Sequence, residues 1–165
     1  MDLQEKIRQL HTQAGQKRKE HLRLVQQLKK MKPFDVDELF HTEHETVFEE
    51  IDCLDCGNCC RTTPALLLHE DISTISKHLR MSAAKFMDEY VRKDEDGDFV
   101  FKHTPCSFLN DDNYCSIYEV RPNACREYPH THQKKMTKIL DLTLTNAGIC
   151  PAVARILDRL EETLL

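Results

Sequence analysis

The sequence predicts a mainly α-helical fold, a small helical domain around a cysteine-rich loop centre, with a long N-terminal helix and a C-terminal helix packing on it. Two observations predict the terminal helices, because apolar residues recur at helical spacing near both ends of the chain. A third observation predicts the centre, where cysteines accumulate among residues with few helix signals. The chain has only four Gly and no Trp, which disfavours a turn-dense β-barrel.

The first predicted element is one long helix over residues 2–32, which Pro33 ends. Lys17 and His21 interrupt its apolar seam, so we expect this helix to pack on the body of the protein rather than to form a dimeric coiled coil. The seam follows alternating steps of four and three, as in a heptad pattern, through Leu3, Ile7, Leu10, Ala14, Lys17, His21, Leu24, Leu28 and Met31.

The segment after Pro33 is acidic and predicts a short helix or an extended link into the cysteines. The apolar run 66–68 predicts a short strand or a buried turn. From Glu70 the spacing becomes helical, with one face formed by Ile72, Ile75, His78 and Leu79.

Ser82 is placed to cap a further helix, which carries Phe86, Tyr90 and Val91. The sequence DEDGD at 94–98 predicts a turn, and residues 99–101 predict a small strand beside it. Residues 104–130 have few helix signals, so they predict a structured loop with short helical turns.

The C-terminal part of the chain predicts two helices. The first covers residues 134–147, with Gly148 placed to end it. Pro151 opens the second at its first position. An apolar stripe predicts that this last helix packs on the core, against the N-terminal helix among others, through Val153, Ile156, Leu157, Leu160 and Leu164.

Length and composition restrict the class of protein. The 165 residues suit one domain, and we expect residues 1–49 to form the N-terminal helix and linker and residues 50–165 the cysteine-cluster domain. A net charge of −5 gives no reason to expect a nucleic-acid partner. We see no secretory signal and no apolar run of about 18 residues. We therefore expect a cytoplasmic protein with no membrane partner, whose thiols stay reduced rather than forming a disulfide framework.

The stretch CLDCGNCC holds four of the eight cysteines, Cys53, Cys56, Cys59 and Cys60. A C-x2-C step turns two sulfurs toward one point, so two steps in series deliver three thiolates to one metal. Thiolates are soft ligands that select zinc, copper(I) or iron–sulfur centres. The spacing predicts that Cys53, Cys56 and either Cys59 or Cys60 converge on one centre. Burial as small apolar side chains does not explain four cysteines in eight residues.

The remaining cysteines are Cys106, Cys115, Cys125 and Cys150. We expect them in the same region, where they join the first centre or build a neighbouring one. Cys150 precedes a helix, whose N-terminal amides favour a thiolate. Of the adjacent Cys59 and Cys60, one is expected to bind while the other serves a second site or stays a redox thiol. Other side chains near these cysteines can offset the charge or complete a site, namely Arg61, Arg121, Arg126, His130 and His132.

The cofactor is predicted to be an iron–sulfur cluster or zinc. The serial C-x2-C steps and the later Cys150-Pro151 pair loosely follow the outline of a bacterial ferredoxin run. The Cys56-Gly57 turn is equally at home in a tetrahedral zinc site, and eight thiolates suffice for two four-thiolate zinc sites. We favour iron–sulfur, because four thiols crowded in one loop suit a polynuclear centre better than one zinc ion.

The stretches CLDCGNCC, PCSFLNDDNYCSIYEVRPNACREYPHTH and NAGICPAVARIL resemble the YkgJ-type cysteine-cluster family, which is described as a zinc- or iron-chelating domain. The resemblance covers roughly residues 50–157. It implies a small intracellular metal-chelating module centred on all eight cysteines. Some relatives are labelled iron–sulfur oxidoreductases, and flagellin lysine methylases carry a similar cluster. This sequence shows no residues for a methyl donor or for flagellin.

The first functional hypothesis is therefore a cysteine-rich intracellular protein that binds an iron–sulfur cluster or zinc through up to eight cysteines. A second is an enzyme, namely an iron–sulfur-dependent oxidoreductase, an electron-transfer protein or a methyltransferase-type protein. A third is a helical interaction protein in which zinc is a structural staple. No catalytic residue is predicted apart from the thiols, and the expected partner is the metal ion or cluster.

Overall fold

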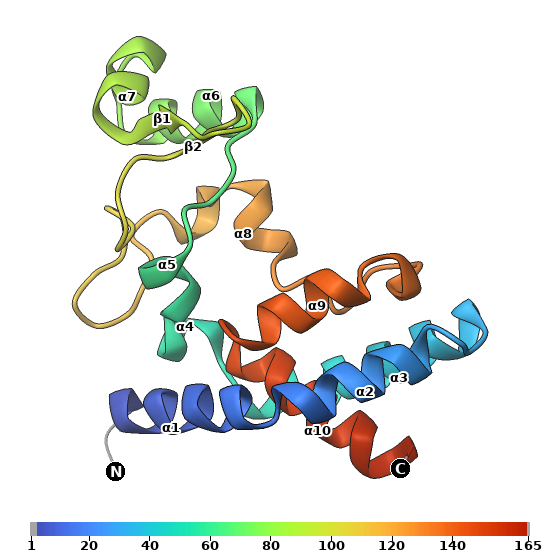
Figure 1. Cartoon of the computed structure of the whole chain (residues 1–165). Coiled ribbons are helices and arrows are strands. Elements are labelled where there is room, and N and C mark those ends of the chain that lie inside the picture. The colour runs from blue at the N-terminus through green and yellow to red at the C-terminus, as the bar shows by residue number, and fades with distance from the viewer. Residues whose placement is uncertain (1–2, 165) are drawn as a thin grey trace. The chain divides into compact units, whose positions relative to one another are not determined.

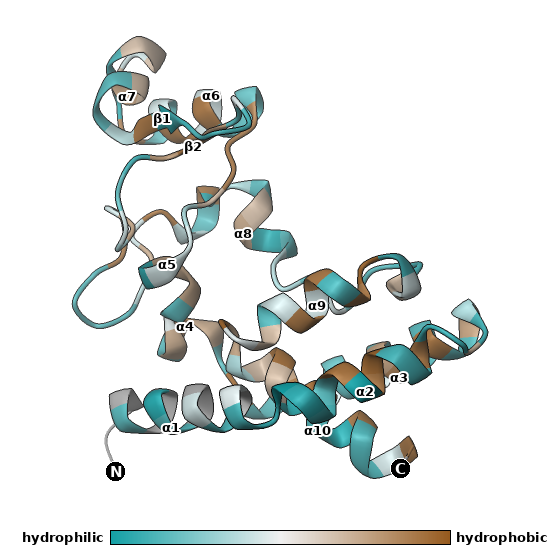
Figure 2. Ribbon diagram, viewed as in Figure 1, coloured by the Kyte–Doolittle hydropathy of each residue, from teal (hydrophilic) through white to brown (hydrophobic). Residues whose placement is uncertain are grey.

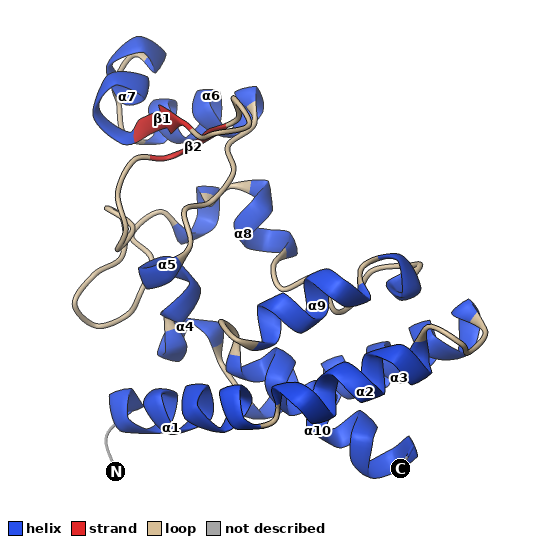
Figure 3. Ribbon diagram, in the orientation of Figure 1, coloured by secondary structure: helices blue, strands red, loops and turns tan. Residues whose placement is uncertain are grey.

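The computed structural model describes residues 3–164, which form two compact units. Unit 1 combines residues 1–56 with residues 129–165, and unit 2 consists of residues 57–128. Helices dominate the described chain, and its only sheet is a small two-stranded one (Figure 3). The predicted mainly helical fold is confirmed. No helix in the described range is long and apolar enough to cross a bilayer.

Unit 1 is helical. Its elements are α1 (Leu3–Gln16), α2 (Arg18–Leu28), α3 (Pro33–Glu50), the single turn α4 (Cys53–Cys56), the 3-10 turn η2 (Met136–Lys138), α9 (Leu140–Ala147) and α10 (Pro151–Leu164) (Figure 1). Helix α10 contacts α1, α2, α3 and α9. Pro151 opens α10 as predicted, because a proline at the first helical position needs no hydrogen-bond partner for its nitrogen.

The core of unit 1 is built from one face of each long helix. Figure 2 shows hydrophobic and hydrophilic residues alternating along α2 and α9, as expected for helices with one buried face. The predicted apolar stripe of α10 is buried at Val153, Ile156, Leu157 and Leu160. These side chains pack with residues of α2, α3 and α9, which include Leu24, Leu28, Val36, Phe40, Val47, Leu140 and Leu144.

The prediction of one helix over residues 2–32 is wrong at its C-terminal end. Helix α2 ends at Leu28, and Pro33 begins α3 instead of ending α2. Lys32 is extended, with φ −65° and ψ 134°, because proline disfavours the helical conformation of the residue before it. Lys17 also separates α1 from α2, although its backbone N–H still donates to the Gln13 carbonyl at 2.9 Å.

The acidic segment after Pro33 forms a longer helix than predicted. It forms the 18-residue helix α3 rather than a short helix or an extended link. Val36, Phe40 and Val47 lie at helical spacing and are fully buried. Burial of these three side chains stabilises the helix despite its many acidic residues, because tertiary packing outweighs local propensity.

The two polar seam residues contact α10. His21 is buried, and its Nε2 lies 2.8 Å from Oδ1 of Asp158. Nζ of Lys17 lies 3.2 Å from the same oxygen. Leu24 and Leu28 continue the seam into the core. The seam therefore packs on the body of the protein over this half, as predicted, whereas the side chains of Leu3, Ile7, Leu10 and Ala14 lie outside the described residues.

The variant Asp158→Asn is expected to lose the part of the pH dependence of folding stability that comes from Asp158. Burial raises the pKa of Asp158, but hydrogen bonds from His21 and Lys17 outweigh burial and lower it. A lowered carboxyl pKa stabilises the fold above the unfolded pKa, and this stability is lost as pH falls through the folded value. Urea unfolding should find the variant less stable by about 1 kcal/mol at pH 7 and equal to wild type near pH 2.

The matched control is Asp141→Asn. Asp141 pairs with Lys29 at 2.7 Å, but its side chain is 79% exposed. An exposed pair contributes little, so this variant should match wild type at both pH values. Equal losses in the two variants would contradict the role given to the buried contact.

Unit 2 joins short helices to one hairpin. Its elements are α5 (Asn58–Thr62), α6 (His69–His78), α7 (Ala83–Tyr90), β1 (Val91–Lys93), β2 (Phe99–Phe101), the 3-10 turn η1 (Tyr118–Val120) and α8 (Asn123–Glu127). The strands are antiparallel, with Val91 opposite Phe101 and Lys93 opposite Phe99. The predicted strand at 99–101 is confirmed. Leu66 forms an isolated β-bridge to Val100. The apolar run 66–68 therefore adds one bridged residue to the hairpin and is not a full strand.

The predicted start of α7 is confirmed, because the Ser82 side chain accepts a hydrogen bond from the Lys85 backbone N–H at 3.1 Å. Unit 2 has its own hydrophobic core, which explains why it is a compact unit. The core gathers side chains from the segment before α6, from α6, α7 and the hairpin, and from the following loop, namely Leu67, Ile72, Ile75, Phe86, Val91, Phe101, Phe108 and Ile117.

Candidate metal centre

All eight cysteines are free thiols in the structure. Cys53 is exposed and the other seven are half-buried. Unit 1 contains three of them, the unit-1 thiols Cys53, Cys56 and Cys150. Unit 2 contains the other five, the unit-2 thiols Cys59, Cys60, Cys106, Cys115 and Cys125.

Backbone hydrogen bonds bring three of the unit-2 thiols together. The Cys60 carbonyl accepts a hydrogen bond from the Cys106 N–H at 2.7 Å. The Cys106 carbonyl in turn accepts one from the Leu109 N–H at 3.0 Å, and Leu109 forms an antiparallel bridge with Cys115. The middle of α5 and the loop at 106–115 are therefore joined by their main chains, with a cysteine at each junction.

Asp71 ties α8, which carries Cys125, to the start of α6. One carboxylate oxygen of Asp71 accepts a hydrogen bond from the Leu68 N–H at 2.8 Å. The other accepts from the Asn123 N–H at 3.1 Å, at the first residue of α8. Sequence reasoning missed this role, although a carboxylate three residues after a helix N-cap is a known capping signal.

The charges of the unit-2 thiols interact with one another. A hydrogen bond from Cys59, which outweighs burial, lowers the pKa of Cys60 to about 7, with Arg61 contributing. Burial, with a smaller contribution from the Cys60 thiolate, raises the pKa of Cys106 to about 11 and that of Cys125 to about 12. The pKa of Cys115 is raised for the same two reasons. Four sulfurs are thus close enough to repel one another as thiolates, and a bound cation would relieve that repulsion.

Two of the three arginines proposed to offset thiolate charge do act on cysteines. Arg61 lowers the pKa of Cys60, and its guanidinium donates to Oδ1 of Asn113. Arg121 lowers the pKa values of Cys115 and Cys125, although burial outweighs it at both. Arg126 instead donates to two backbone carbonyls, those of Glu119 and Arg121. Its contacts hold the loop that precedes α8.

The unit-1 thiols form a second group. Cys53 and Cys56 stand at the two ends of α4, and Cys150 directly precedes α10. Burial, with smaller contributions from the charges of Cys53 and Cys56, raises the pKa of Cys150 to about 12. Backbone N–H groups at the start of α10 favour the thiolate, as predicted, but their effect is smaller than that of burial. The structure therefore brings Cys150 near Cys53 and Cys56 within unit 1.

The prediction that Cys53 and Cys56 converge with Cys59 or Cys60 stays a prediction. Among the side chains that the structure describes, no three His, Cys, Asp or Glu residues already surround a point where a metal ion fits. The donor set itself fits zinc or an iron–sulfur cluster, because reduced and partly buried thiols are gathered in each unit. The sulfurs must turn to close on a metal, as expected when metal binding and local ordering are coupled.

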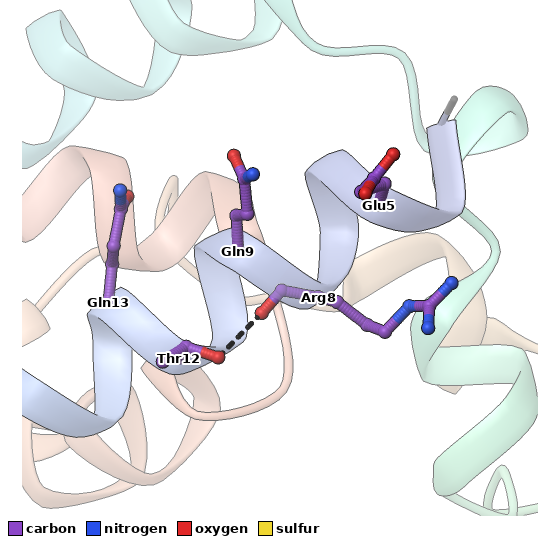
Figure 4. Close-up of a pocket in the computed structure, with 5 residues that line it drawn as sticks. All are labelled: Glu5, Arg8, Gln9, Thr12 and Gln13. Atoms are coloured by element: carbon purple, nitrogen blue, oxygen red, sulfur yellow. Dashed lines mark hydrogen bonds between the residues drawn. The ribbon is translucent and has the colours of Figure 1, made fainter. Parts of the chain in front are cut away.

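The other candidate residues lie elsewhere. His130 and His132 belong to unit 1, and Nε2 of Gln133 donates to Nδ1 of His130 at 2.7 Å. A shallow depression along α1 is lined by Glu5, Arg8, Gln9, Thr12 and Gln13 (Figure 4). These residues come from one helix and include no cysteine, so the depression is not the metal centre.

The variant Gly57→Ala is expected to lower the free energy of unfolding by about 1–2 kcal/mol, because Gly57 has a φ of +59° that side chains with a Cβ rarely adopt. Steric contact adds little, since the nearest atom to an added Cβ is Nη1 of the flexible Arg61 at 3.2 Å. Gly57 stands between Cys56 and Cys59, so metal content should fall as well. Urea unfolding and metal analysis check both.

The matched control is Gly97→Ala, in the turn of the hairpin. Its φ is +83°, and nothing lies within 4 Å of an added Cβ. This variant should show comparable backbone strain with unchanged metal content. Full metal retention in both variants would contradict the link between Gly57 and the thiols.

Comparison with known proteins identifies the class to which this chain belongs. The CxxCxxCC family model, described as "Putative zinc- or iron-chelating domain", matches residues 52–144. The match covers more than half of the chain and seven of its eight cysteines, from Cys53 to Cys125. The chain belongs to this family, and the resemblance noted from the sequence is confirmed. No curated protein and no solved structure matches it.

Proposed function

We propose that this metal-chelating protein holds an iron–sulfur cluster through its unit-2 thiols, with the unit-1 thiols as a second set of ligands. Zinc is the alternative metal at the same thiols. The observation that carries the proposal is the gathering of Cys60, Cys106, Cys115 and Cys125 within unit 2, where main-chain contacts join the segments of the first three and the pKa of Cys125 is raised by the other three. Four thiolates are the usual complement of both a [4Fe–4S] cluster and a structural zinc.

Iron–sulfur is favoured by the number of thiols that crowd into a short stretch. Cys59 stands beside Cys60 and hydrogen-bonds to its sulfur, so unit 2 offers a fifth thiol next to the four. A [4Fe–4S] cluster and a mononuclear zinc each use four thiolates, so the preference for iron–sulfur rests on the crowding of the thiols, which suits a polynuclear centre better than one zinc ion. When bound, an iron–sulfur cluster supplies one-electron transfer, which supports the oxidoreductase or electron-transfer hypothesis. Zinc would supply a structural crosslink and would support the interaction-protein hypothesis.

The test is anaerobic purification followed by absorption spectroscopy and analysis of iron, zinc and acid-labile sulfide. We expect a brown protein that contains iron and sulfide. A colourless protein that contains zinc would overturn the iron–sulfur assignment and support the structural staple. A protein with neither metal under these conditions would overturn the proposal as a whole.

Variants then identify the ligands. Cys106→Ser and Cys125→Ser should each lose most of the bound metal. The matched control is Ser107→Ala, because Ser107 is the exposed neighbour of Cys106. Cys150→Ser tests the unit-1 thiols, and a partial loss of metal is expected because Cys60, Cys106, Cys115 and Cys125 remain.

A further inference from the structure

A group of histidines in unit 1 contains no cysteine and lies where α3 meets the segment 130–133. His41 and His44 are one turn apart on α3. Nδ1 of His44 lies 2.8 Å from Oγ1 of Thr131, and Nε2 of His41 donates to the Gln133 carbonyl at 2.9 Å. The ring of His132 lies beside that of His44, with 5.0 Å between ring centroids and 45° between planes.

The distance between these two ring centroids matches the distance expected for two histidines that bind one metal ion. A zinc–imidazole bond of about 2.0–2.1 Å places the ring centroid about 3.2 Å from the metal. Two imidazoles at angles between 90° and the tetrahedral value then have centroids about 4.5–5.2 Å apart. The His44 and His132 rings fall within that interval.

The surroundings prepare His44 as a ligand. Thr131 is fully buried, so its hydroxyl is held in place beside the ring. When Nδ1–H of His44 donates to Oγ1 of Thr131, Nε2 carries the lone pair that binds a metal.

We propose that His44 and His132 bind a divalent transition-metal ion of the zinc class through their imidazole nitrogens, with water completing the coordination, at a site that uses no cysteine. His44 is half-buried and His132 is exposed, so an ion can reach the pair from solvent. His41 is a positioning residue, because its Nε2 is engaged by the Gln133 carbonyl. Two protein ligands give a weaker site than a set of thiolates, so the ion should bind reversibly and exchange readily.

The test titrates the full-length protein with zinc(II) at pH 7.5, after its thiols have been saturated with zinc and excess metal removed. Calorimetry measures the affinity, and NMR of the histidine ring carbons identifies the ligands. We expect one additional site, at which the His44 and His132 resonances shift together. Shifts at other histidines, or no additional site, would overturn the proposal.

Variants separate this site from structural effects. His132→Gln should weaken the additional site at least about 10-fold without unfolding, because His132 is exposed. Thr131→Val keeps the side-chain shape but removes the partner of Nδ1, and should weaken binding about 10–100-fold. His78→Gln, at an exposed histidine of α6, is the control and should change nothing. Unchanged affinity in His132→Gln would refute the pair as ligands.

Failure of the histidine site is distinguishable from failure of the proposed metal binding by the thiols. Zinc that enters vacant cysteine positions lowers the number of thiols open to alkylation and leaves the histidine ring resonances unshifted. Zinc bound by His44 and His132 shifts their ring resonances and leaves the number of thiols open to alkylation unchanged. A protein whose thiols hold no metal can therefore still show or lack the imidazole site.

Discussion

Removal of the bound metal with a chelator is expected to open residues 104–128 to proteolysis while α6, α7 and the hairpin of unit 2 stay folded. The segment 104–128 places only Phe108 and Ile117 in the core of unit 2, whereas six of the eight core residues lie outside it. The segment is also held by the half-buried Cys106, Cys115 and Cys125 and by two hydrogen bonds, from Asn123 to Asp71 and from Arg61 to Asn113. Structural metal binding contributes about 10–16 kcal/mol in small metal-dependent domains, so its loss should dominate here.

Limited proteolysis with mass spectrometry, run beside circular dichroism, measures this effect. Cleavage within 104–128 should accelerate by on the order of 100-fold or more, while most of the helical signal remains. Cys125→Ser should behave like the chelated protein, and Ser107→Ala like the untreated one. If the metal-free protein keeps this segment protected, the metal is a removable functional ligand, and the electron-transfer hypothesis gains support.

The variant Phe40→Ala is expected to destabilise unit 1 by about 3–5 kcal/mol, because it removes a large, fully buried side chain at the centre of α3. The cavity left behind would lie among core residues such as Leu28, Val153 and Ile156. Urea unfolding followed by circular dichroism measures the loss, and metal content of the folded protein should be unchanged.

The control is Phe34→Ala on the same helix. Phe34 is 73% exposed, so its removal should change the free energy of unfolding by less than about 0.5 kcal/mol. A loss below about 1 kcal/mol in Phe40→Ala would mean that unit 1 collapses around the missing ring. That result would contradict the close packing expected of this core.

The elements that could be predicted from the sequence are those that local rules determine. Ser82 and Pro151 begin helices because the capping hydroxyl and the fixed proline φ act within one turn. Pro33 predicts the end of a helix because proline stops a preceding helix, but the same ring also begins α3. The length of α3 was underestimated, because its acidic residues hide the buried Val36, Phe40 and Val47.

The candidate site was predictable in its residue types but not in its grouping. The spacing of the cysteines indicates soft-metal ligands, and the family match confirms a metal-chelating domain. Which thiols lie together depends on contacts such as the Cys60–Cys106 hydrogen bond, which no local pattern encodes. The same holds for His44 and Thr131, which are 87 positions apart and come together only in the folded chain.

The contact of His21 and Lys17 with Asp158 also selects one alignment of α2 along α10. A shift of one helical turn would remove His21 from its carboxylate and bury it among aliphatic side chains, which is costly for an unpaired polar group. We infer that this polar contact fixes the register of α2 on α10. Asp158→Leu should leave His21 buried without its carboxylate and lower the free energy of unfolding, whereas an unchanged free energy of unfolding would refute this.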